Sequence, residues 1–172
     1  IEEKLDKCLA QYLAIEPPPT DIGKVNDVFF AETLSFGIDA AIALSTMKTR
    51  DKNHKTGRSL YFSAGVDQFL NHYNYCKYHA IFDDSDELSG ESLTFAVQNG
   101  QTYGGGFKIC PDAKIDDGIL NICIGQGKMN RAGALWLFNK AKEGKHVDSP
   151  HVLLKEAKKL KINFEGKPPC QV

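Results

Sequence analysis

Short segments in which apolar and polar residues alternate limit the fold of this chain more than any other feature. The alternation is clearest over residues 160–164, and it recurs earlier, over 78–82, 93–97 and 120–124. A period of two is typical of strands that bury one face. Few helical segments separate these strands, which favours antiparallel pairing over a parallel sheet. We therefore expect an α+β fold that is mainly β, namely an antiparallel β-sandwich with peripheral helices.

Apolar residues spaced three and four apart predict the helices. The segments are 5–13, 37–50, 59–73 and 130–142, and residues 28–31 form a further predicted strand, which we expect to be buried. The first helix ends before Pro17, Pro18 and Pro19, because proline lacks the amide hydrogen that a helix needs. This helix is too short to build a core alone, and the sequence has no initial Met. We therefore expect a fragment of a longer protein.

The composition of the 172 residues is that of an ordinary globular domain, with 42% hydrophobic and 25% charged residues. The formal net charge is -1, whereas proteins that wrap nucleic acid carry a strong basic excess, so we expect no nucleic-acid partner. No apolar run is long enough to cross a bilayer. The five cysteines form no C-x-x-C pair, which favours reduced thiols in a cytosolic protein.

The stretch from Asn99 to Ile122 is the richest in turn residues. It contains Gly104-Gly105-Gly106, then Pro111, then Asp116-Asp117-Gly118 ahead of a predicted strand. In one interpretation the triple glycine forms a β-bulge and Asp-Asp-Gly forms a hairpin turn. In the other, a carboxylate of the turn and nearby carbonyl groups hold Mg²⁺, which needs few protein carboxylates. The glycines match no common phosphate loop, and no Gly-x-Ser-x-Gly elbow occurs, so we expect neither a nucleotide site nor a serine hydrolase in this chain.

The spacing of these residues resembles a known family. Gly104 to Gly106, Pro111-x-Ala113 and Asp116-Asp117-Gly118-x-Leu120 are similar to the hallmark GGG-x(4)-P-x-A-x-x-DDG-x-L of the diacylglycerol kinase-like lipid kinases, which are related to NAD kinases and sphingosine kinases. Upstream, residues Phe29 to Ala40 resemble the family's F-x-N-x-x-S-x-G-x-D-A. The resemblance runs from about Asp21 to Val172 and implies the C-terminal sandwich domain of such a kinase.

The same resemblance implies how the chain is divided. The family's N-terminal domain carries a GGDGT phosphate loop, which this sequence lacks. Residues 1–20 would then be a helix and Pro linker left over from a missing N-terminal nucleotide-binding domain, and residues 21–172 the sandwich domain. No catalytic residue is implied in this chain, because the family's general base, the Glu of a DGE motif, is expected just beyond Val172. Glu32 and Asn121 depart from the family pattern, which has Asn and Asp there.

For the site, the resemblance implies weakly bound Mg²⁺ held by the carboxylate of Asp117 and the carbonyl groups of Lys114 and Ile119. It also implies a substrate-side set, which consists of Ser35, Gly37, Asp39, Asn99, Gly104, Gly105, Gly106 and Asp116. The residues alone offer simpler roles for three of these. Ser35 would be a helix N-cap, Asp39 an acid favoured by the helix dipole, and Asp116 a turn residue.

The function implied by the resemblance is transfer of the γ-phosphoryl group of ATP to a lipid hydroxyl by the full-length enzyme, with this fragment inactive. ATP would be bound mainly by the missing domain, and the lipid acceptor would lie at a membrane surface. We expect a cytoplasmic protein peripheral to the membrane and leave open a homo-oligomer and the identity of the lipid. A non-catalytic lipid- or protein-binding module and a kinase of the same superfamily with a soluble acceptor remain alternatives.

Basic residues gather between positions 48 and 58. Such a loop could contact anionic lipid head groups, and a solvated charged loop is the alternative. The residues are Lys48, Arg50, Lys52, His54, Lys55 and Arg58.

Overall fold

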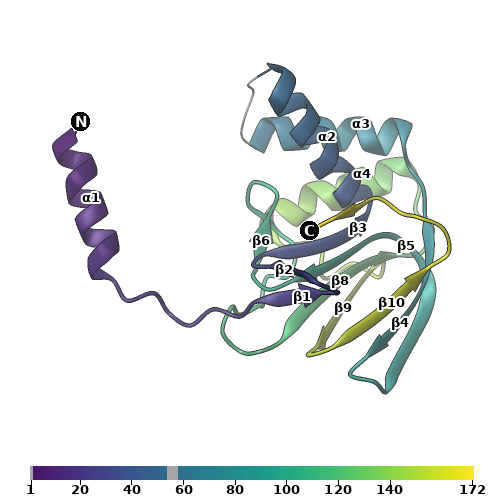
Figure 1. Ribbon diagram of the computed structural model, residues 1–172. Helices are drawn as coiled ribbons and strands as arrows, with labels where there is room; N and C mark the ends of the chain where they lie inside the picture. Colours follow the sequence, from purple (N-terminus) through teal and green to yellow (C-terminus); the bar gives the residue numbers. More distant parts are fainter. Residues whose placement is uncertain (1, 54–57) are drawn as a thin grey trace.

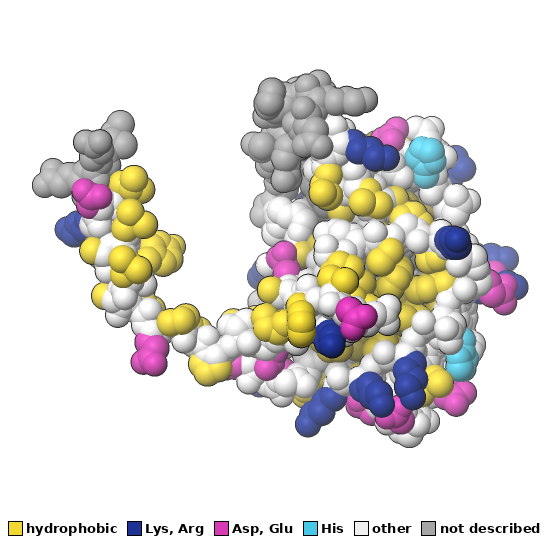
Figure 2. Space-filling model, in the orientation of Figure 1, with side chains coloured by type: hydrophobic (Ala, Val, Ile, Leu, Met, Phe, Trp, Pro, Cys, Tyr) yellow, Lys and Arg dark blue, Asp and Glu magenta, His cyan; other side chains and the backbone are white. Residues whose placement is uncertain are grey.

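The computed structural model describes the backbone of residues 2–53 and 58–172 and the side chains of residues 5–49 and 62–172. The helices are α1 (Glu2–Ala14), α2 (Ile38–Asn53), α3 (Arg58–Asn71) and α4 (Arg131–Lys140), and a 3-10 turn, η1 (Ala141–Glu143), follows α4. The strands are β1 (Gly23–Val25), β2 (Val28–Phe30), β3 (Thr33–Gly37), β4 (Cys76–Phe82), β5 (Asp86–Gln98), β6 (Thr102–Tyr103), β7 (Phe107–Lys108), β8 (Leu120–Gln126), β9 (Val152–Ala157), β10 (Leu160–Phe164) and β11 (Cys170–Gln171). Figure 1 shows α2, α3 and α4 at one end of the β-rich body, with α1 standing apart from it. Figure 2 shows hydrophobic side chains exposed along α1.

The long strand β5 joins two leaves of one sheet. Its first half pairs with β4, and β4 pairs in turn with β10. Its second half pairs with both β3 and β8. Strand β3 pairs in turn with β11, and β8 pairs with β9. The register of β5 shifts between Ser92 and Thr94, and a bulge of this kind bends a strand. Every described pairing is antiparallel, and the leaves share one core, which confirms the predicted sandwich.

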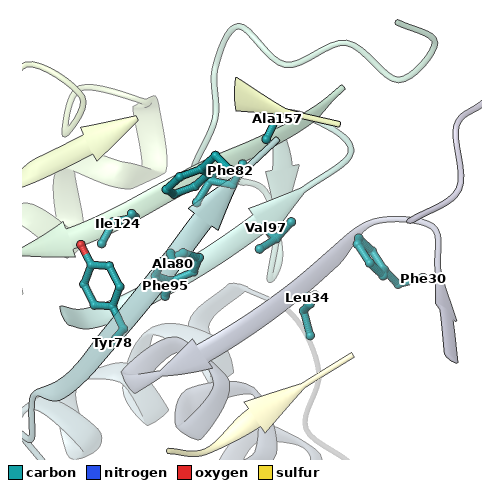
Figure 3. Close-up of a cluster of buried hydrophobic side chains, with 10 residues drawn as sticks. Phe30, Leu34, Tyr78, Ala80, Phe82, Phe95, Val97, Ile124 and Ala157 are labelled. Atoms are coloured by element: carbon teal, nitrogen blue, oxygen red, sulfur yellow. The ribbon is translucent and has the colours of Figure 1, made fainter. Parts of the chain in front are cut away.

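The core of the sandwich is formed by alternate residues of the paired strands. Figure 3 shows Tyr78 and Phe82 of β4 in the same cluster as Phe95 of β5 and Ile124 of β8. The side chain of Phe95 is fully buried, and its ring centroid lies 5.3 Å from that of Tyr78 and 6.1 Å from that of Phe164. Both ring pairs meet edge to face, a favourable geometry for aromatic rings.

A second core lies between the sheet and the helical layer. Ile42 of α2, Phe69 of α3 and Ala134 of α4 pack there with Leu93 of β5 and Phe107 of β7. The leaf that contains β3, β5 and β8 is therefore covered on both faces. Helices α2 to α4 complete the fold as peripheral elements, as the sequence predicted.

The four predicted helices are present, with ends that differ by a few residues. Six strands were not predicted. Four of them, β1, β6, β7 and β11, are only two or three residues long, and the two longer ones are β3 and β9. In β3 nearly every residue is buried, so no alternation marks it. In β9, Val152 faces the helical layer while Leu153 packs in the sandwich core, and the adjacent apolar residues again hide the period of two. The expectation of a buried strand at 28–31 was wrong in part, because β2 in the β1–β2 hairpin exposes Val28 and Phe29 and buries Phe30 in the sandwich core.

The glycine and Asp-Asp-Gly turns also differ from the simpler expectations. Gly104, Gly105 and Gly106 form the turn of the β6–β7 hairpin and not a bulge. Asp116-Asp117-Gly118 is no hairpin turn, because β8 pairs with the distant strands β5 and β9. Ser35 is no N-cap, since it lies inside β3 before α2 begins. Of the six basic residues between 48 and 58, only Lys48 lies among the described side chains, where it is exposed.

Truncation of the Phe95 side chain tests the sandwich core. We expect Phe95→Ala to lower the free energy of unfolding by about 3–5 kcal/mol, because it removes a fully buried ring from between two aromatic partners. Urea denaturation followed by circular dichroism measures this change. Lys167→Ala, at an exposed position, is the control and should change stability by less than about 0.5 kcal/mol. An equal effect of both changes would contradict the assigned core.

Candidate functional site

An apolar cavity lies between the sheet and the helical layer. It has a volume of about 80 Å³ and is lined by side chains of α2, α3, α4, β5, β8 and the β6–β7 hairpin. Ile42, Leu93, Phe107 and Leu137 represent the aliphatic and aromatic residues that make up most of its wall. An apolar wall with few polar groups is typical of sites for apolar molecules, although pockets for drug-sized ligands are larger, about 300–1,000 Å³. The cavity as it stands can therefore hold only a small part of such a molecule.

One carboxylate, that of Asp39, belongs to the wall of this cavity. Asp39 is 6% exposed and lies in the first turn of α2. Its Oδ1 accepts a hydrogen bond of 2.7 Å from the Thr94 hydroxyl, and its Oδ2 accepts one from the Tyr103 hydroxyl. Burial raises the pKa of Asp39 above its usual value, and the hydrogen bonds from Tyr103 and Thr94 oppose that rise. The site therefore contains an acid–base group in an apolar setting, which is typical of functional carboxylates.

The backbone at Gly37 places Asp39 in this wall. Gly37 ends β3 with a φ of +94°, a conformation that favours glycine, and α2 begins at the next residue. A Cβ at this position would lie 2.4 Å from the Leu93 carbonyl oxygen in β5. The close contact between Gly37 and β5 thus fixes where the first turn of α2 meets the sheet. Of the predicted substrate-side residues, Gly37 therefore sets the position of Asp39.

The triple glycine positions two residues of the same cavity wall. Gly104, Gly105 and Gly106 have φ values of 57°, 85° and 93°, so only glycine fits this turn without strain. The flanking residues Tyr103 and Phe107 pair across the hairpin, and both line the cavity. The turn therefore holds in place the hydroxyl that binds Asp39 as well as an aromatic ring of the wall.

Two other predicted substrate-side residues are buried in the structure next to this region. Ser35 lies in β3, opposite Ala96 of β5, and is fully buried. Asn99 follows β5, and its side-chain amide donates hydrogen bonds to the carbonyl oxygens of Asp21 (2.7 Å) and Ala31 (3.2 Å). Neither Ser35 nor Asn99 lines the cavity among the described residues.

The Asp-Asp-Gly loop lies outside the cavity lining. Asp116 and Asp117 are exposed, and Oδ1 of Asp117 accepts a hydrogen bond of 3.0 Å from the Ile119 amide. Oδ2 of Asp21 accepts one of 2.6 Å from the Gly118 amide, and the Asp21 amide donates to the Ile115 carbonyl at 2.6 Å. The structure therefore adds a carboxylate that the sequence did not indicate, because Asp21 is almost one hundred residues away.

The donors in this loop fit a hard cation. They are the carboxylates of Asp117 and Asp21 together with backbone carbonyl groups, and Mg²⁺ prefers oxygen ligands of these kinds. No group of three or more His, Cys, Asp or Glu residues that could hold a metal ion occurs within residues whose placement is described. Any metal site here would therefore depend on carbonyl groups and water for most of its ligands.

Several residues of the cavity wall carried no signal in the sequence. Thr94 and Tyr103 come from separate elements and meet Asp39 only in the fold. Cys123 of β8 and His146, after η1, also line the cavity, with Sγ and Nε2 3.8 Å apart. Burial raises the pKa of Cys123 and lowers that of His146, so both side chains are neutral near pH 7.

The fold and the cavity together define a class: an antiparallel β-sandwich domain whose helical layer encloses an apolar cavity with a buried acid. Residues 32–172 match the family described as the YegS C-terminal NAD kinase beta sandwich-like domain. The chain belongs to this family, which confirms the resemblance found in the sequence.

Relatives from bacteria carry lipid kinase names. A "Probable lipid kinase YegS-like" protein of Pseudomonas fluorescens (strain Pf0-1) is 28% identical over 159 residues, which is 86% of this chain and 49% of that protein. A protein of the same description from Pseudomonas aeruginosa strain PAO1 is 28% identical over 161 residues, 87% of this chain and 50% of that protein. The chain thus spans about half the length of these relatives.

Solved structures share the fold. One is described as a diacylglycerol kinase from Bacillus anthracis str. Sterne, with a TM-score of 0.61 at 17% identity, covering 90% of this chain and 46% of that one. Another structure from the same organism gives a TM-score of 0.65 at 20% identity, with coverage of 90% and 48%. At these identities the likeness concerns the fold. In the described part of the chain, no helix is both long enough and apolar enough to span a bilayer.

The hydrogen bond from Tyr103 predicts how the Asp39 carboxyl titrates. We expect Tyr103→Phe to raise the pKa of Asp39 further, because the substitution removes a donor that stabilises the carboxylate. NMR of the side-chain carboxyl carbon as a function of pH measures this pKa. Tyr75→Phe, which removes a hydroxyl that bonds to Tyr73 and the Met129 amide, is the control and should leave Asp39 unchanged.

The titration of Asp39 should also make the free energy of unfolding depend on pH. The folded state holds the Asp39 proton more tightly than the unfolded state, whose pKa is near 3.8. The contribution of Asp39 to the free energy of unfolding should therefore fall as pH rises from about 3.8 through its raised folded-state pKa. In Tyr103→Phe this fall should extend to higher pH. A pKa of Asp39 that is the same in both proteins would contradict the assigned role of Tyr103.

Proposed function

We propose that this chain is the acceptor-side domain of an ATP-dependent lipid kinase, which in its full-length form phosphorylates a lipid hydroxyl. The observation that carries the proposal is the apolar cavity with the buried carboxylate of Asp39 in its wall. A lipid acceptor combines a hydrocarbon part with a hydroxyl group. The aliphatic and aromatic wall would cover the part of the hydrocarbon next to the hydroxyl, and the hydroxyl needs a polar partner. The lipid kinase names of the relatives support the same function.

In this proposal Asp39 accepts a hydrogen bond from the acceptor hydroxyl and orients it. Thr94 and Tyr103 hold the carboxylate from the side of the protein, so its position does not depend on substrate. Phosphoryl transfer is mostly positioning and electrostatic stabilisation, so an oriented hydroxyl is a substantial part of the catalyst. The helical layer would keep water away from the hydrocarbon part of the acceptor.

The remaining parts of the reaction lie outside this chain in our proposal. The sequence has no common phosphate-binding loop, so ATP would be bound mainly by a second, N-terminal domain. The general base is expected just beyond Val172. We therefore expect the 172-residue chain alone to be inactive towards lipids, since loss of a general base typically costs about 10²–10⁴-fold by itself.

Kinase assays with the full reading frame test this function. Labelled ATP, Mg²⁺ and mixed-lipid vesicles should give labelled lipid with the full-length protein and none with the 172-residue chain. Ala134 is 3% exposed and lines the cavity, so Ala134→Leu should fill it and lower kcat/KM for long-chain acceptors by about tenfold or more.

Ala132→Leu is the matched control on the same helix. Ala132 is exposed, so this change adds the same atoms outside the cavity and should leave kcat/KM within about twofold of the wild type. Thermal unfolding checks that both variants fold. Equal activity of the two variants would show that the cavity is not part of the acceptor site. Turnover by the 172-residue chain would mean that the nucleotide site lies within these 172 residues.

We also propose that Mg²⁺ binds weakly in the Asp-Asp-Gly loop, through the Asp117 carboxylate and the carbonyl groups of Lys114 and Ile119. The exposed carboxylates of Asp117 and Asp116 and the neighbouring Asp21 support this assignment. When bound, Mg²⁺ would spread the negative charge of the transferring phosphoryl group.

A titration of the isolated chain with Mg²⁺ tests the metal site. Amide NMR shifts should be confined to residues 114–119 and to Asp21, and Asp117→Asn should weaken binding about tenfold or more because it removes a charged ligand. The asparagine oxygen can still accept the hydrogen bond from Ile119, so the loop should keep its shape. Asp112→Asn, a nearby exposed aspartate, is the control. Shifts of equal size in both variants would rule the site out.

A further inference from the structure

Positive charge is concentrated in the segment that contains α4. Residues 127–145 carry one acidic side chain, Glu143, although the whole chain has a net charge of -1. The cationic residues of the segment are Lys128, Arg131, Lys140, Lys142 and Lys145. The rest of the chain is therefore net acidic, so α4 and its flanking residues differ in charge from the remainder of the molecule.

Much of this charge is not neutralised by neighbouring acids. Lys145 pairs with Glu143 at 2.6 Å, and Lys128 lies 3.9 Å from Glu91 with 83% of its side chain exposed. No ion pair of Arg131, Lys140 or Lys142 occurs among the side chains that the structure describes. An unneutralised cluster of cations next to a helix is attracted to anionic surfaces.

Helix α4 has two distinct faces. Its inner face, with Ala134 and Leu137, lines the cavity. Its outer face exposes Trp136, the single tryptophan of the sequence, at 58%. Arg131 is also exposed and lies on a flank of this face, because five residues correspond to well over a quarter turn of the helix. The ammonium group of Lys140 lies 4.0 Å from the centroid of the Trp136 ring. We call the side chains of Lys128, Arg131, Trp136 and Lys140 the α4 outer face, in which the first three are exposed and Lys140 is half-buried.

This combination suits a membrane surface better than a protein surface. Tryptophan is enriched where a bilayer meets water, and long lysine side chains extend from such a position to anionic head groups. The outer face also contains exposed Ala132 and Asn139, so it has no continuous apolar patch of the kind that protein interfaces bury. A groove beside Trp136, lined by Lys128, Asn130 and His151 among others, offers polar groups at head-group depth.

We propose that the α4 outer face docks the protein on an anionic bilayer. This inference rests on the proposed function, because it explains how a lipid reaches the cavity. A helix is about 10–12 Å across with its side chains, so docking through the outer face places the cavity one helix diameter from the head groups. Trp136 enters the interfacial region, and the surrounding cations pair with lipid phosphates. Figure 1 shows α4 beside α3 at the helical end of the molecule, away from the turn between β4 and β5.

Vesicle binding of the 172-residue chain tests the docking surface directly. The probes are vesicles of phosphatidylcholine alone and of phosphatidylcholine with 30 mol% phosphatidylglycerol. Trp136 is the chain's single tryptophan, so its fluorescence reports this surface without interference. We expect a blue shift and quenching by brominated lipids with the anionic vesicles, and binding that weakens as salt is raised from about 0.05 to 0.5 M.

Charge reversal identifies the surface. We expect Arg131→Glu/Lys140→Glu to lower the partition coefficient on anionic vesicles more than about tenfold. Lys158→Glu/Lys167→Glu changes the net charge equally at two exposed lysines outside the α4 outer face and should lower it less than about threefold. Circular dichroism checks the fold of both. Equal losses in the two variants, or no blue shift of Trp136, would overturn the proposal. Self-association of the chain through this face, seen by sedimentation equilibrium without vesicle binding, would overturn it as well.

Kinetics with the full reading frame separate docking from the proposed function. The α4 variant should lose activity on anionic vesicles and keep it on a monomeric short-chain acceptor, whereas loss on both would contradict a docking role. If the wild-type protein binds vesicles through Trp136 but phosphorylates no lipid, the proposed function fails and the docking surface stands. If it phosphorylates lipids with no need for the α4 outer face, the docking proposal fails alone.

Discussion

The fold depends on one strand that belongs to both leaves of the sandwich. The first half of β5 pairs with β4, and its second half pairs with β3 and β8 on either side. Past the bulge, its side chains alternate between two cores: Phe95 and Val97 pack inside the sandwich, whereas Thr94 and Ala96 face the helical layer and line the cavity. A disturbance of β5 would therefore reach the sandwich core and the candidate site together.

The buried carboxylate of Asp39 is the least expected feature of this arrangement. A charged group in an apolar wall is costly unless it is hydrogen-bonded, and two hydroxyl donors from different elements offset that cost. The glycines at position 37 and at 104–106 make both contacts geometrically possible. Such an arrangement fixes the position of the acid, and because burial raises its pKa, the ionised form costs stability.

The sequence predicted most of the architecture because one-sided strands and amphipathic helices record burial in their periodicity. The segments at 120–124 and 160–164 belong to β8 and β10, and the helix near 130–142 to α4 and η1. Periodicity gives no signal where a strand is buried on both faces, as in β3, or where adjacent apolar residues pack in different cores, as in β9. In these strands apolar and polar residues do not alternate along the sequence.

The glycine and Asp-Asp-Gly spacing was sufficient by itself to determine the family, since these residues mark backbone conformations that few others adopt. The triple glycine, and Gly37 and Asp39 in the upstream segment from Phe29 to Ala40, stay a prediction of substrate-side residues. Only the tertiary structure decided what surrounds them: that Tyr103 and Thr94 bind Asp39, that Asp21 joins the Asp117 loop, and that a cavity lies behind α4. These contacts join residues tens of positions apart, and local sequence carries no record of which distant side chains the folded sheet brings together.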